Sequence, residues 1–180
     1  MEKIARICWN TQEWKRPSGR DGKSKANKSY EKEYGFGHEE WLLDFSRVMP
    51  NGYHYGFLES LRVRSGKHIG HTYDIHLFTI TPNKEKIYIG CLHNATAIDN
   101  EESQYVYSYY EKKGWLREME DDVISVGGKI ENFEAELDTL KNALKMNVDI
   151  SDIDTVIISH GHKDHGGALK CFLEQNKKAK

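Results

Sequence analysis

The chain has 180 residues, of which 38% are apolar and 30% charged, and its formal net charge is −2. This composition is too apolar for a disordered chain, and no apolar run is long enough to span a bilayer. The three cysteines are few and widely spaced, so we expect a reducing, cytoplasmic environment without a disulfide framework or a membrane partner.

The first 123 residues predict an α+β domain with a mostly antiparallel sheet and helices. Strands are expected where β-branched and aromatic residues cluster or alternate, and loops where proline and glycine interrupt the pattern. In chain order the predicted elements are a strand over 3–9, a loop over 10–37, strands over 53–63, 72–80 and 86–92, a hairpin turn at Pro82-Asn83, and helices over 101–113 and 115–122.

Residues 124–180 predict a second segment. A helix is expected over 131–146, because Phe133, Leu137, Leu140 and Leu144 recur at helical spacing and the opposite face is acidic. A short β-branched strand over 155–158, a glycine-rich loop and a helix over 167–175 follow. The expected fold is therefore α+β, with an N-terminal sheet domain followed by a β-loop-α unit.

Charge is distributed unevenly along the chain. Residues 15–32 hold seven Lys or Arg and two acidic residues in a Ser-, Gly- and Asn-rich stretch, which predicts an exposed basic loop. Residues 116–154 hold four cations and eleven acids. A chain that is basic early and acidic late favours a division into two regions, which we place at 1–123 and 124–180.

The strongest chemical pattern is the run Ser159-His160-Gly161-His162-Lys163-Asp164-His165-Gly166-Gly167, between the last predicted strand and helix. Three imidazoles and one carboxylate fall within six residues. These groups are suitable ligands for zinc above all, or for iron or manganese. The glycines allow sharp backbone turns, so that the side chains can converge on one ion.

At these residues the sequence resembles the metallo-β-lactamase superfamily, whose signature is His-x-His-x-Asp-His. The resemblance covers about residues 124–180 and implies a metal-dependent hydrolase with a partial metallo-β-lactamase-like unit. It implies that His160 and His162 bind one metal ion and that Asp164 and His165 bind a second. A hydroxide held between the two ions would attack the substrate, with Asp164 orienting it as the catalytic residue.

The sequence departs from this family pattern in three respects. Ser125 stands in the Ser125-Val126-Gly127-Gly128 segment where the family has an aspartate, and the family's further metal ligands, expected well downstream of the motif, are absent from the fifteen residues after His165. The family also begins with a run of β-strands that leads directly into this segment, which residues 1–123 do not clearly supply. Two interpretations follow: the start of a hydrolase domain cut short, or a half-site completed by a partner chain. Other histidines could also supply ligands, namely His38, His54, His68, His71, His76 and His93.

The first region suggests a different function. Aromatic residues interleave with glycines beside the basic loop, and nucleic-acid readers use cations for phosphates and aromatic faces for bases. Over about residues 3–120 this alternation of aromatic residues and glycines resembles N-terminal modules of HNH-type and modification-dependent restriction proteins. The resemblance implies DNA binding, with a modified base held in an aromatic pocket. The candidate nucleic-acid-binding residues are Lys15, Arg16, Arg20, Lys23, Lys25, Lys28, Trp14 and Trp41.

Two alternatives remain open for this region. The same aromatic residues could form a packed core, or they could serve a protein interaction. The neighbouring acids Glu39 and Glu40 do not predict a shared catalytic role, because adjacent side chains point apart on a strand and lie about 100° apart on a helix.

Overall fold

A computed structural model of the chain describes residues 1–21, 23, 30–61, 67–130, 133 and 143–147. The chain divides into two compact units, Met1–Asn147 and Val148–Lys180. The second unit lies outside the described residues, and with it the predicted strand over 155–158 and helix over 167–175. No helix in the described part of the chain is long and apolar enough to cross a membrane.

The first unit is built on a five-stranded mixed sheet, which confirms the predicted α+β class. The strands are β1 (Glu2–Arg6), β2 (Tyr53–Phe57), β3 (Thr72–Ile80), β4 (Lys86–Ala97) and β5 (Ala143–Asn147). Their order across the sheet is β1-β3-β4-β5-β2. Strand β1 runs parallel to β3, whereas the other three pairings are antiparallel.

The β3–β4 hairpin follows the sequence pattern closely. Every second residue of β3 from Tyr73 to Thr79 is buried, as the alternation of side chains predicts. The hairpin closes through the predicted turn at Pro82-Asn83, where the Thr81 amide donates to the Glu85 carbonyl over 2.9 Å. Strand β4 extends beyond the predicted residue 92 to Ala97, and β2 ends at Phe57, earlier than predicted.

Two longer helices, α2 (Asn100–Lys113) and α3 (Trp115–Ser125), follow the hairpin as predicted. The side chain of Asp99 caps the start of α2 by accepting from the Glu102 amide over 2.8 Å. Gly114, with φ of 76°, ends α2 in the left-handed conformation that favours glycine. The short helices are α1 (Tyr30–Tyr34) and the 3-10 turns η1 (His38–Trp41) and η2 (Glu59–Leu61).

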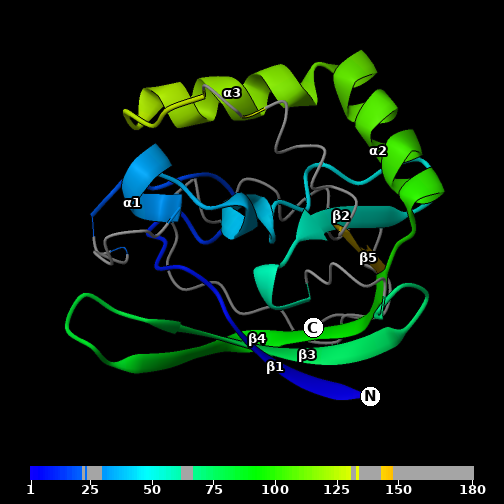
Figure 1. Ribbon diagram of the computed structural model, residues 1–180, viewed down its shortest axis with the longest axis horizontal. Coiled ribbons are helices and arrows are strands. Elements are labelled where there is room, and N and C mark those ends of the chain that lie inside the picture. The colour runs from blue at the N-terminus through cyan, green and yellow to red at the C-terminus, as the bar shows by residue number, and fades with distance from the viewer. Residues whose placement is uncertain (22, 24–29, 62–66, 131–132, 134–142, 148–180) are drawn as a thin grey trace, which may run out of the picture. The chain divides into compact units, whose positions relative to one another are not determined.

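Two clusters of buried side chains stabilise this unit. One packs against the inner face of β1, β3 and β4 and includes Ile7, Ile75 and Leu77, each at most 1% exposed. The other joins β2 to the helices through residues such as Tyr55 and Val106. Figure 1 shows α2 and α3 on the side of β2 away from the β3–β4 hairpin.

The helix predicted over 131–146 is wrong at its C-terminal end, because residues Ala143–Asn147 form β5. Leu144 and Met146 are 0% and 3% exposed, whereas Lys145 between them is partly exposed, so the burial period here is two. Strand β5 lies between β4 and β2 in the sheet. Residues up to Asn147 therefore belong to the first unit, and the division falls later than the predicted 123/124 boundary.

Candidate functional site

The four predicted metal ligands, His160, His162, Asp164 and His165, lie outside the described residues. Among the residues that the structure describes, no three His, Cys, Asp or Glu side chains are grouped so that they could hold a metal ion. The ring nitrogens of the buried His54 lie 3.4 Å from the Arg47 carbonyl and 3.1 Å from the Leu42 carbonyl. Burial lowers the pKa of His54, against the raising effect of its contacts with the Arg47 and Leu42 carbonyls.

Three of the predicted DNA-binding cations lie on the surface of the first unit. Lys15, Arg16 and Arg20 are exposed, and they lie in the loop that follows β1. Lys15 forms an exposed ion pair with Glu13, and the Arg16 guanidinium donates to the Gln12 side chain. Lys25 and Lys28 lie outside the described residues.

Lys23 corrects the prediction of a uniformly exposed basic loop. Its side chain is 1% exposed, and its ammonium group forms an ion pair with the fully buried carboxylate of Glu40. A buried ammonium group needs such a partner, because leaving it unpaired in a low-dielectric interior is costly. Lys23 is therefore engaged inside the protein and does not present its charge to a phosphate.

The two tryptophans predicted to stack on bases are also buried. Trp14 is 7% exposed and donates its indole N–H to the Cys8 carbonyl over 3.0 Å. Trp41 is 4% exposed and donates to the Asp122 carboxylate of α3 over 3.0 Å. Both indoles thus serve packing, which was the open alternative for these aromatic residues.

The buried carboxylate of Glu40 is the centre of the hydrogen-bond network that shapes the loop after β1. It accepts from the Asn10 amide side chain over 2.8 Å, from the Ser18 amide over 3.0 Å and from the Gly37 amide over 3.0 Å, besides pairing with Lys23. The Asn10 side chain in turn donates to the Arg16 carbonyl over 2.8 Å. Segments far apart in sequence are joined at one point, so the described part of the loop, residues 10–21 and 23, is tied to Glu40 by several hydrogen bonds and an ion pair.

Glu39 points to a different partner from Glu40, as expected for adjacent side chains. One oxygen of Glu39 accepts from the Cys8 backbone amide over 2.5 Å. Burial, with a smaller contribution from the nearby Glu31 carboxylate, raises the pKa of Glu39 to about 7 against the lowering effect of the Cys8 amide. Burial of the Cys8 thiol, together with the nearby carboxylates of Glu39 and Glu40, raises the pKa of this thiol. The thiol therefore stays protonated and unreactive at neutral pH.

Neither the Glu40 network nor the raised pKa of Glu39 was predicted from the sequence. The available signal was the run His38-Glu39-Glu40-Trp41, in which two acids stand next to a tryptophan. Acidic residues are rarely buried unless they are paired, and their pairing partners here are distant in sequence.

Compared with protein-family models, with curated proteins and with solved structures, the chain shows no significant match.

Proposed function

We propose that the unit Met1–Asn147 binds DNA through the loop that carries Lys15, Arg16 and Arg20. The observation that supports this most is the burial of Glu40, which ties the loop to the rest of the unit and leaves those three cations outside. A loop that is already ordered loses little conformational entropy when it binds, so more of the electrostatic attraction appears as affinity. Contacts of Lys and Arg with phosphates position DNA without reading its sequence.

The first test is the salt dependence of DNA binding by the full chain. We expect the affinity for a labelled duplex to fall as salt rises, with each phosphate contact contributing about 0.9 to the slope of log affinity against log salt. Replacing Lys15, Arg16 and Arg20 with Glu should weaken binding and reduce the magnitude of this slope by about 2 to 3. Fluorescence anisotropy between 50 and 200 mM salt measures both quantities.

A charge-matched control separates the loop from the net charge of the protein. Lys112, Lys113 and Arg117 are exposed on α2 and α3, and their replacement with Glu changes the net charge by the same amount. We expect this variant to retain most of the affinity. No binding of the unmodified protein to plain or cytosine-methylated duplex at low salt, or equal losses in the two triple variants, would refute the proposal.

We also propose that the motif containing His160, His162, Asp164 and His165 binds a divalent metal ion, with zinc as the best match to its ligands. The supporting observation is the donor set, since imidazole nitrogens and carboxylate oxygens within six residues match the ligands that zinc prefers. The metal would supply a hydroxide for hydrolysis at neutral pH. A competent hydrolase of this class needs further ligands, from a downstream segment or from a partner chain.

Metal content tests this second proposal. The full chain should purify with zinc, or take it up on dialysis, and a variant with His160→Ala and His162→Ala should lose it. A matched control replaces two histidines of the sheet surface, His76 and His93, and should keep the metal. Elemental analysis that finds the same metal content in the protein and in the motif variant, whether negligible or stoichiometric, would rule the site out.

A further inference from the structure

One face of the β1–β3–β4 part of the sheet carries rows of partly or fully exposed side chains. The buried residues of β3 face the inner core, so the residues between them face outward, and the register assigns their neighbours on β1 and β4. We call this the platform face, and its residues are Glu2, Ile4 and Arg6 on β1, Asp74, His76, Phe78 and Ile80 on β3, and Lys86, Tyr88, Cys91 and His93 on β4.

Aromatic rings occupy the middle of the platform face. Tyr88 is 62% exposed, and its ring centroid lies 6.0 Å from that of His76 at an interplanar angle of 36°. The Tyr88 hydroxyl lies 3.1 Å from Nδ1 of His76, which holds the two rings in a fixed relation. Phe78 is partly exposed and is the register partner of Tyr88, so the two residues lie in the same row of the platform face.

Charge on the platform face is arranged along the strands. Phe78 of β3 lies between its register partners Tyr88 on β4 and Arg6 on β1. The exposed Lys86 lies on β4 in the next row toward the hairpin turn, opposite Ile80. Glu2 and Asp74 are partners at the opposite end. The aromatic rows therefore lie next to cations on the side of the hairpin turn and next to carboxylates on the other side.

We propose that the platform face stacks the unpaired bases of a single-stranded nucleic acid, with Tyr88, His76 and Phe78 against the bases and Arg6 and Lys86 against the phosphates. This inference rests on the proposal that the unit binds nucleic acid, and it assigns single strands to the platform face, separately from the duplex contacts of the basic loop. Bases have apolar faces that stack on aromatic side chains without sequence preference, and open sheet faces are a recurrent surface for them. The carboxylates at the far end repel phosphates and direct the backbone toward Arg6 and Lys86.

The composition of the platform face favours nucleic acid over a protein surface. The fully buried centre of a protein interface is depleted in charge, whereas here Arg6, Lys86, Glu2 and Asp74 flank the rings on both sides. The exposed Ile4, at 75%, and the neighbouring His76 form the least polar row. Sheet strands lie about 4.8 Å apart, so rings on neighbouring strands are close enough to contact successive bases.

The test compares a labelled single strand of mixed sequence with the duplex of the same sequence, using the full chain. Tyr88→Ala should weaken single-strand binding by about 5- to 150-fold, the range for loss of one stacked base, and leave duplex binding nearly unchanged. Tyr88→Phe keeps the ring and should retain the affinity, which shows that stacking, and not the hydroxyl, is responsible. Circular dichroism of each variant checks that the fold persists.

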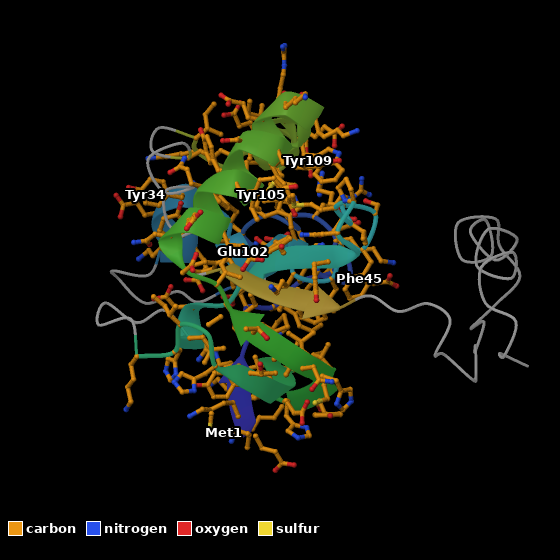
Figure 2. All side chains as sticks on the ribbon, turned by 90° about the vertical axis from the view of Figure 1, so that its right-hand side faces the viewer. Met1, Tyr34, Phe45, Glu102, Tyr105 and Tyr109 are labelled. Atoms are coloured by element: carbon orange, nitrogen blue, oxygen red, sulfur yellow. The ribbon has the colours of Figure 1, made fainter. Side chains whose placement is uncertain are left out.

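The matched control is Tyr105→Ala, since Tyr105 is 53% exposed on α2. Figure 2 shows Tyr105 and Tyr109 at the opposite end of the unit from Met1, where β1 begins. Equal effects of Tyr88→Ala and Tyr105→Ala, or no effect of Tyr88→Ala on single-strand binding, would overturn the inference. So would a change of oligomeric state in Tyr88→Ala by light scattering without a change in binding, since the face would then be an interface between copies of the chain.

The two proposals fail in distinguishable ways. If the Lys15, Arg16 and Arg20 variant loses duplex binding while Tyr88→Ala changes nothing, the basic loop stands and the platform does not. If Tyr88→Ala weakens single-strand binding while the triple variant binds both forms normally, the platform stands and the basic loop does not. If neither form binds at low salt, both are refuted.

Discussion

Glu39 and Glu40 are neighbours in sequence but have opposite environments. Glu40 receives an ammonium group and several N–H donors, so its buried negative charge is compensated. Glu39 receives the Cys8 amide and has the Glu31 carboxylate nearby, so burial dominates and raises its pKa to about 7. Glu40 therefore ties the described part of the loop to the rest of the unit, whereas Glu39 makes the stability of the protein depend on pH.

The direction of this dependence follows from the raised pKa. The folded protein holds the Glu39 proton up to about pH 7, whereas the unfolded chain releases it near 4.5. The stabilising contribution is full below pH 4.5 and is lost as pH rises through 7. We expect Glu39→Gln, which keeps an acceptor for the Cys8 amide, to gain stability relative to the unmodified protein by on the order of 3 kcal/mol between pH 4.5 and 8.5.

Urea unfolding of both proteins across this range measures the difference. Glu111→Gln is the control, because Glu111 is an exposed carboxyl on α2 and its removal changes the net charge equally. A stability difference between Glu39→Gln and the unmodified protein that stays constant with pH would contradict the assignment of Glu39.

Lys23 shows what the sequence could not reveal at the scale of single residues. Its neighbours in sequence are polar and small, which wrongly indicated an exposed side chain. Its partner Glu40 is 17 residues away, and nothing local marks the pair. The burial of Trp14 and Trp41 was an open alternative for the same reason, since an aromatic residue packs or stacks according to tertiary contacts.

At the scale of elements, the sequence predicted what local chemistry determines. The ends of α2 were predictable because Asp99 and Gly114 satisfy the helix termini through neighbouring backbone groups. Strand β3 was predictable because its burial alternates along its whole length. Strand β5 was not predictable in this way. Phe133 and Leu144 belong to a pattern with helical spacing, and only the buried pair Leu144 and Met146 shows the period of two that a strand has.

The segment after α3 depends on a close approach at Gly128. A Cβ there would lie 2.6 Å from Cγ1 of Val123, 3.0 Å from its carbonyl oxygen and 3.1 Å from the Tyr34 carbonyl oxygen. Because two of these atoms are backbone, the clash is not relieved by a rotamer change. We expect Gly128→Ala to lower the free energy of unfolding by about 1–3 kcal/mol, as overpacking generally does.

Chemical denaturation at fixed pH measures this loss. The exposed neighbour Lys129 provides the control, and Lys129→Ala should stay within about 0.5 kcal/mol of the unmodified protein. Equal stability of the two variants would show that α3 and α1 do not approach each other closely at this glycine.

At the scale of the whole molecule, the division of the chain determines which fragment folds. A fragment of residues 1–147 keeps both buried clusters and all five strands. A fragment of residues 1–123, the predicted domain, loses β5 together with Phe133, which is 1% exposed in the helical cluster. The sequence indicated two regions through their opposite charge, but charge on the surface does not report where the sheet is completed.

We therefore expect fragment 1–147 to unfold cooperatively and fragment 1–123 to lack cooperative unfolding. Burying a leucine such as Leu144 alone is worth about 1.5–3 kcal/mol, a large share of the stability of a small domain. Thermal unfolding followed by circular dichroism distinguishes the two. A cooperative transition in the shorter fragment, with the midpoint of the longer one, would contradict the assignment of β5 to this unit.

The position of β5 has a consequence for the order of events during synthesis. Strand β2 is translated before the hairpin, yet its neighbour in the sheet is β5, the last of the described strands to leave the ribosome. Until residue 147 has emerged, β2 and the last residues of β4 face each other across a vacant position. Such distant pairings slow folding and leave strand edges unprotected, so a nascent chain paused before this point is a substrate for chaperones.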